Sequence, residues 1–190
     1  MPDINKKAKE RLWSLLYAEK YLDCLKLART ILAVQPEDLN ARMFEGVSLL
    51  NLEDYDGAIS ALDKCLLLRS DFFPALDSRA KAYFKKKDYD KALSDAEKFL
   101  DYMESANSYG LASVCLYKKG EKSKAYEYID LAIEIAKEEK YNFCIQKASF
   151  LENDGHIEEA LKYYKTKPEK GTIDKDIKNK IKRLEKNKTC

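Results

Sequence analysis

Apolar and small residues recur along the chain with a long period. Tyr21, Tyr55 and Tyr89 are separated by 34 residues each. A small residue follows each of them by three positions, and this series continues with steps of 34, 34, 33 and 35 residues through Cys24, Ala58, Ala92, Ala125 and Ala160. Twelve residues before each lies a second position, which is small in four of five cases: Leu12, Gly46, Ala80, Ser113 and Ala148. The pattern predicts five copies of one structural unit.

Each copy predicts two antiparallel helices. Helices joined by a short turn approach to about 8–10 Å only where the facing side chains are small, which accounts for the paired small positions. Polar residues or glycine lie between the pairs, as at Lys87-Asp88 and Gly120-Glu121, and these are turn signals. The second helices carry apolar residues at helical spacing, as in Ala58, Leu62 and Cys65. The predicted fold class is therefore all-α.

A 34-residue helical hairpin of this kind resembles the tetratricopeptide repeat. The second copy matches it best, with Gly46, Leu49, Tyr55, Ala58 and Leu62 at positions where the family has Gly, an apolar or aromatic residue, Tyr, Ala and a large apolar residue. The chain departs from the family at its early Trp, which is replaced by Ala8, Arg42, Leu76, Tyr109 and Cys144. The resemblance covers about residues 5–167 and implies a right-handed α-solenoid. We expect a single domain over 1–190, with repeats at about 5–38, 39–72, 73–105, 106–139 and 140–170.

A different pattern follows the repeats. Ile173, Ile177, Ile181 and Leu184 are spaced by 4, 4 and 3 residues in an otherwise charged segment. They predict a capping helix over about 172–188, with Thr172 as its N-cap, that covers the open face of the fifth hairpin. Two alternatives stay open: this stripe could form the seam of a homodimer, or the segment could be a basic tail for an acidic partner, since 165–190 holds ten basic and four acidic residues.

Composition narrows the function classes. The chain is 45% hydrophobic and 36% charged, which is enough to bury a core, and its formal charge of only +2 excludes a purely electrostatic binder, so we do not expect nucleic acid as a partner. No apolar run approaches the roughly 20 residues of a membrane-spanning helix, and the first residues lead into no signal-peptide core. We therefore expect a cytoplasmic protein, with a nuclear location as the alternative, and no membrane partner.

Candidate chemistry is sparse. The five cysteines include no CxxC pair, so we expect reduced, mostly buried thiols and neither a metal nor another cofactor. The single histidine, His156, falls in a predicted turn, and the chain has no phosphate loop or nucleophile motif. Adjacent carboxylates such as Glu158 and Glu159 point away from each other on a helix. We expect no enzymatic activity.

The resemblance implies a binding surface instead, because the first helices of this family line the concave side of the solenoid. The residues expected to form a peptide-binding groove are Lys9, Trp13, Tyr17, Met43, Phe44, Val47, Lys81, Phe84, Tyr117 and Lys118. Aromatic and methionine side chains suit an adaptable interface, and the lysines suit an acidic or C-terminal segment of a partner. As an alternative, Trp13, Tyr17, Met43 and Phe44 fill the space between neighbouring hairpins.

The best-known groove of the family is a two-carboxylate clamp that grips the acidic C-terminus of cytosolic chaperones with Lys, Asn, Asn, Lys and Arg. The corresponding positions here are Lys9, Trp13, Phe44, Pro74 and Ser78, so one of five matches. We therefore predict a non-catalytic scaffold or adaptor that binds a peptide segment of another protein without this clamp. The alternative function is an assembly subunit that self-associates through its terminal repeats or its C-terminal helix.

Overall fold

The structure is a computed structural model that describes residues 4–136, 140–168 and 171–188. Over these ranges the chain forms eleven α-helices and no strand, so the predicted all-α class is confirmed. The helices are α1 (Ile4–Tyr17), α2 (Tyr21–Val34), α3 (Leu39–Asn51), α4 (Tyr55–Leu68), α5 (Phe73–Lys85), α6 (Tyr89–Leu100), α7 (Ala106–Lys119), α8 (Lys122–Ile135), α9 (Lys140–Asn153), α10 (Ile157–Tyr164) and α11 (Lys175–Lys188).

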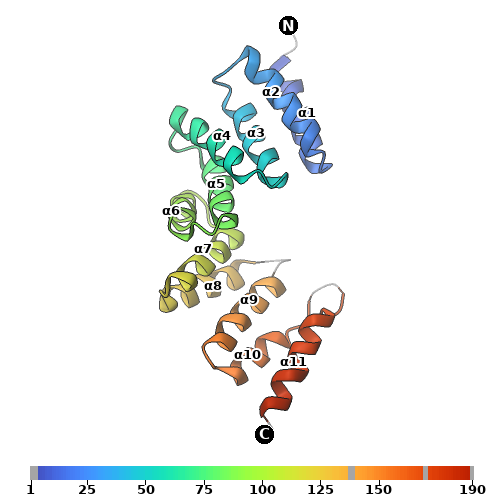
Figure 1. Ribbon diagram of the computed structural model, residues 1–190, viewed down its shortest axis with the longest axis vertical. Coiled ribbons are helices and arrows are strands. Elements are labelled where there is room, and N and C mark those ends of the chain that lie inside the picture. The colour runs from blue at the N-terminus through green and yellow to red at the C-terminus, as the bar shows by residue number, and fades with distance from the viewer. Residues whose placement is uncertain (1–3, 137–139, 169–170, 189–190) are drawn as a thin grey trace. The chain divides into compact units, whose positions relative to one another are not determined.

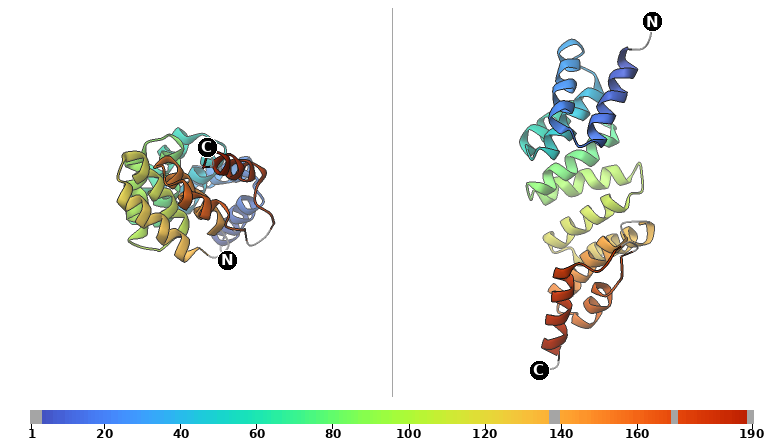
Figure 2. Two further views of the ribbon diagram at one scale, coloured as in Figure 1. Left: turned by 90° about the horizontal axis from the view of Figure 1, so that it is seen from below. Right: turned by 90° about the vertical axis from the view of Figure 1, so that its right-hand side faces the viewer.

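Consecutive helices pair into five hairpins, from α1 with α2 to α9 with α10 (Figure 1). The chain divides into two compact units, which are described separately: unit 1 spans 1–103 and contains α1–α6, and unit 2 spans 104–190 and contains α7–α11. Figure 2 shows the paired helices within each unit from two further sides. The single domain over 1–190 stays a prediction.

The turn inside every hairpin has the same backbone geometry. One residue in each turn has a left-handed conformation, with φ between 55° and 85°: Glu19, Glu53, Lys87, Gly120 and Gly155. The next residue donates its N–H to the carbonyl five residues before it, as from Asp54 to Leu49 at 2.9 Å, which satisfies a free carbonyl at the helix end. The left-handed residues follow one another by 34, 34, 33 and 35 positions, the same steps as the small residues.

The small positions lie where the paired helices touch. Cys24, Ala58, Ala92, Ala125 and Ala160 are all fully buried. Gly46 shows how close the approach is, because a Cβ added there would lie 2.6 Å from Cγ of Leu62 on α4. A larger residue at either place would force the two helices apart.

The last helix covers the apolar face of the fifth hairpin. Ile181 and Leu184 of α11 are buried against residues of α9 and α10 that include Leu151 and Tyr164. This is the position expected of a capping helix. The predicted N-cap was wrong: α11 begins at Lys175, and the carboxylate of Asp174 accepts a hydrogen bond of 2.7 Å from the backbone N–H of Asp176.

Candidate peptide-binding surface

The first helices of the three hairpins in unit 1 lie side by side, since α3 contacts both α1 and α5. We call the outward surface of α1, α3 and α5 the first-helix wall. Eight of the ten predicted groove residues lie on these three helices, whereas Tyr117 and Lys118 lie on α7 in unit 2. The first-helix wall is therefore the surface on which most of the predicted site can be judged.

An exposed aromatic pair marks the wall at α1. The rings of Trp13 and Tyr17 stack with centroids 5.7 Å apart, and Trp13 also meets Phe44 edge to face at 4.9 Å. Tyr17 is 81% exposed and Trp13 is 44% exposed. Trp13 is thus held by the core on one side and accessible on the other, which is the usual state of an interface anchor.

The first helices of unit 1 also carry lysines. Lys9 lies one helical turn before Trp13 and is half-buried, and Lys85 of α5 is exposed. Neither has an ion-pair partner among the described residues, whereas Lys81 binds Asp77 at 2.6 Å. The wall therefore offers two uncompensated positive charges, which favour an acidic ligand.

Two predicted groove residues belong to the core instead. Phe44 is fully buried and Met43 is 5% exposed, and both pack in the main apolar cluster of unit 1. Both side chains therefore occupy space between the hairpins and offer almost no surface to a ligand, so the structure gives their predicted role as ligand contacts no support. Val47 and Phe84 are half-buried and present only part of their surface on the wall.

Tyr117 makes contacts with other residues of unit 2. Its ring stacks face to face on Phe150 at 4.2 Å, and its hydroxyl donates to Asp154 at 2.7 Å. Burial, followed by the hydrogen bond to Asp154, raises the pKa of Tyr117 to about 12. Asp154 also accepts from Lys122 and Tyr126 and has a lowered pKa, chiefly because of Lys122. These contacts join the fourth hairpin to the fifth, while Lys118 is exposed.

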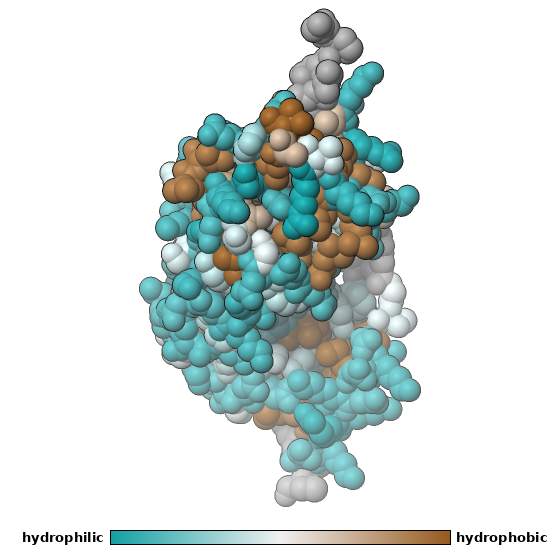
Figure 3. Space-filling model, turned by 45° about the horizontal axis from the view of Figure 1, so that its top comes forward, coloured by the Kyte–Doolittle hydropathy of each residue, from teal (hydrophilic) through white to brown (hydrophobic). Residues whose placement is uncertain are grey.

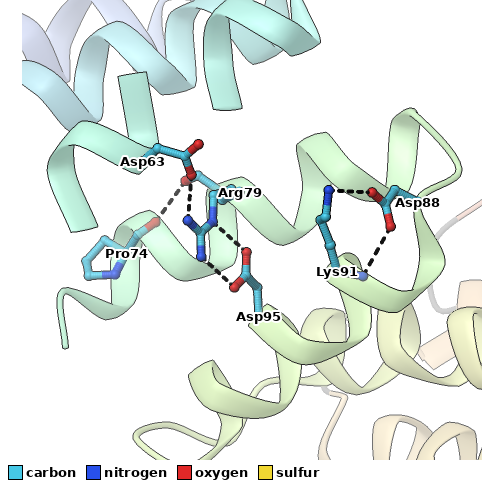
Figure 4. A network of polar contacts seen from close by, with 7 residues as sticks. Asp63, Pro74, Arg79, Asp88, Lys91 and Asp95 are labelled. Atoms are coloured by element: carbon cyan, nitrogen blue, oxygen red, sulfur yellow. Dashed lines mark hydrogen bonds and ion pairs between the residues drawn. The ribbon is translucent and has the colours of Figure 1, made fainter. Parts of the chain in front are cut away.

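A partly buried ion-pair network joins α5 to its neighbours (Figure 4). Arg79 donates two hydrogen bonds to the carboxylate of Asp95 on α6, at 2.7 and 2.8 Å, and a third to Asp63 on α4, at 2.6 Å. Burial alone would lower the pKa of Arg79, but the two carboxylates outweigh it and raise that pKa. All three side chains are thereby occupied in joining helices, and the pattern of the sequence did not indicate this network.

Sequence reasoning also missed a second apolar patch in unit 1. Phe73 stacks on Tyr102 with centroids 6.4 Å apart, and the side chains of Phe73, Tyr102 and Met103 are 37%, 56% and 48% exposed. Figure 3 shows brown apolar side chains in several places on the end of the molecule that comes forward, among teal polar ones. Phe73 is the first residue of α5, and Tyr102 and Met103 follow the end of α6. A search for periodic residues is least able to predict side-chain exposure at such helix ends.

The thiols in the described part of the chain are buried. Cys24, Cys65, Cys115 and Cys144 are all buried, and burial raises the pKa of Cys65 to about 11. Cys190 lies outside the described residues. Within those residues no three His, Cys, Asp or Glu side chains gather to hold a metal ion, and none of the helices is long and apolar enough to cross a membrane.

The stacked hairpins with shared small contacts and one recurring turn geometry define a helical-repeat protein. Residues 10–71 match the sequence profile of the tetratricopeptide repeat. Residues 10–71 therefore carry tetratricopeptide repeat sequence, as the spacing of the small residues predicted.

Solved structures show the same fold. MamA 41-end from Desulfovibrio magneticus RS-1 is 19% identical, with a TM-score of 0.76 over 100% of this chain and 99% of that one. TTC0263, a thermophilic tetratricopeptide repeat protein in Thermus thermophilus, is 17% identical, with a TM-score of 0.70 over 94% and 97%. YrrB, described as having an unusual peptide-binding site, is 24% identical, with a TM-score of 0.63 over 72% and 71%. No curated protein sequence matches the chain significantly.

Proposed function

We propose that this protein is a non-catalytic adaptor whose first-helix wall binds a peptide segment of another protein, with Trp13 and Tyr17 as the anchor. The exposed aromatic pair is the observation that carries this proposal. Tetratricopeptide repeats serve protein interaction in general, and YrrB, of the same fold, has a peptide-binding site.

The chemistry of the wall supports a ligand with apolar and acidic side chains. An apolar residue placed on Trp13 and Tyr17 would remove aromatic surface from water, which favours binding. A carboxylate nearby would meet Lys9, whose charge has no ion-pair partner among the described residues. Positively charged ligands are disfavoured by the same lysine, although the aromatic rings alone would accept a cation.

The carboxylate clamp of chaperone adaptors does not form part of the proposal. Of the five clamp positions, Phe44 is fully buried and Ser78 hydrogen-bonds the carbonyl of Pro74 at 2.8 Å. A terminal carboxylate needs charge-assisted donors at those places. We therefore expect a different ligand chemistry from that of the chaperone tail.

Self-association through the apolar stripe of α11 has less support than peptide binding. Ile181 and Leu184 pack against α9 and α10 of the same chain and are less than 10% exposed. A dimer seam would have to pull them away from that contact, at the cost of burying less of the fifth hairpin.

Selection of peptides from a random library against the whole protein tests the proposal. Tyr17→Ala should weaken the selected peptides about tenfold or more, since hot-spot truncations cost about 2 kcal/mol, and it should leave the melting temperature unchanged because Tyr17 is largely exposed. Tyr102→Ala removes an exposed tyrosine from the other patch of unit 1 and serves as the matched control. Equal affinity of the selected peptides for the wild type and Tyr17→Ala would refute the assignment.

A further inference from the structure

The outward face of α11 carries a regular row of lysines. Lys175, Lys178, Lys182 and Lys186 are exposed and are spaced by 3, 4 and 4 residues, so they lie on one face of the helix. We call these four residues the lysine stripe. At a rise of 1.5 Å per residue, the stripe is about 16 Å long. The apolar residues Ile177, Ile181 and Leu184 occupy the other side of α11, which packs on the fifth hairpin.

Three charges of the lysine stripe lack partners within unit 2. Lys175, Lys178 and Lys182 make no ion pair with any described residue. Neighbouring cations of the same helix are paired, because Lys180 and Arg183 bind Glu152 at 2.7 and 3.1 Å.

Capping does not account for the stripe. Like charges three or four residues apart destabilise a helix, and the apolar contact of α11 with α9 and α10 uses the opposite side. Alternating acidic and basic residues would keep that outer face equally soluble without the repulsion. A row of one sign is favoured where an anionic partner supplies the missing charges.

We infer that the lysine stripe is a second docking surface, which takes an acidic helical segment of a partner protein. Residues four apart on a helix rise by about 6 Å, so glutamates at spacings of 3, 4 and 4 on a partner helix would meet the lysines one to one. The complementary charge and the matched spacing define this partner.

Two other anionic partners fit the surroundings less well. The described part of α11 has no aromatic side chain on which bases could stack, and Asp174 and Asp176 at its start repel a wide polyanion such as RNA. A lipid surface would attract the lysines, but Ile181 and Leu184 are buried in the protein and cannot insert. A narrow acidic helix avoids both difficulties.

This inference goes beyond the proposed function, since it concerns unit 2 and needs neither Trp13 nor Tyr17. The test uses the whole protein and a synthetic helical peptide with four glutamates spaced by 3, 4 and 4 residues. A peptide of the same composition with scrambled order is its control. Binding is followed at low salt by NMR chemical shifts of the α11 amides, because a few exposed ion pairs give a weak complex.

The variant Lys175→Gln/Lys178→Gln/Lys182→Gln removes the unpaired charges while leaving the buried side of α11 intact. The variant Lys26→Gln/Lys64→Gln/Lys98→Gln makes the same charge change with exposed lysines of unit 1. The inference expects saturable shifts in α11 with the patterned peptide. The affinity should fall about tenfold or more for the scrambled peptide and for the α11 variant, equivalent to about 1.4 kcal/mol, and should stay within about twofold for the unit 1 variant.

Three results would overturn the inference: equal affinity for the patterned and scrambled peptides, no α11 shifts with either peptide, or tighter binding of single-stranded RNA or of vesicles containing phosphatidylserine than of the patterned peptide. Circular dichroism of the α11 variant checks that the helix is retained, so a loss of binding reports on charge.

Discussion

The close contact between Gly46 and Leu62 allows a quantitative test of hairpin packing. In Gly46→Ala, the new Cβ would lie 2.6, 2.8 and 3.3 Å from Cγ, Cδ2 and Cδ1 of Leu62. Carbon atoms in contact are normally about 3.5–4.0 Å apart, so the overlap is close to 1 Å. Leu62 is fully buried and the nearest atom is its branch point, so the side chain has no free direction in which to turn.

The expected free energies follow from two opposing effects. Overpacking costs about 1–3 kcal/mol, whereas alanine in place of a helical glycine gains about 1 kcal/mol, so Gly46→Ala should destabilise unit 1 by about 1 kcal/mol. Leu62→Ala alone should cost about 2–5 kcal/mol through lost burial and a cavity. In the double variant the clash disappears and the added methyl group partly fills the cavity. The double variant should therefore cost about 1–3 kcal/mol less than the sum of the single changes.

Urea unfolding followed by the fluorescence of Trp13 measures these differences, because Trp13 is the one tryptophan in the chain and lies in the same unit. Ser60→Ala, an exposed change on α4, combined with Leu62→Ala should be additive and provides the control. If Gly46→Ala and Leu62→Ala also add to within about 0.5 kcal/mol, the close approach of α3 and α4 at this point is wrong.

Three further changes test other features. Gly120→Ala should destabilise unit 2 by about 1 kcal/mol in a urea melt from backbone strain alone, since φ is 84° and an added Cβ would meet no atom within 4 Å; an unchanged midpoint would contradict the left-handed turn. Asp154→Asn should cost about 1–3 kcal/mol at neutral pH. Because the folded pKa of Asp154 is lowered, its contribution to the free energy of unfolding is present above the ordinary carboxyl pKa of about 4 and is lost as the pH falls through the folded value. The stabilities of wild type and variant in urea melts should therefore converge at low pH. Finally, mass spectrometry after brief thiol labelling should find Cys24, Cys65 and Cys144 unmodified in the native protein, because burial raises their pKa values; labelling as fast as in urea would disprove their burial.

The repeat could be predicted because its constraint is local. Small residues twelve positions apart must meet wherever two helices are joined by a short turn, and the turn residues Glu53 and Lys87 lie at fixed offsets from them. The start of α11 was predicted three residues too early for a related reason. Thr172 and Asp174 are both good N-cap residues, and local preference cannot choose between them. Which residue caps α11 depends on how Ile177, Ile181 and Leu184 pack on the fifth hairpin, and this tertiary packing cannot be read from the local sequence.

Which of the predicted groove residues are exposed was only half predictable, because equal helical spacing gave Trp13 and Phe44 the same expected role. Their surroundings separate them. Helix α3 packs against α1, α2, α4 and α5, so Phe44 is enclosed, whereas the contacts of α1 are to α2 and α3. On this less enclosed helix Trp13 is 44% exposed and Tyr17 is 81% exposed. The anchor that we propose therefore lies on α1, and we expect a ligand that avoids α1 to lose the exposed aromatic surface of Trp13 and Tyr17.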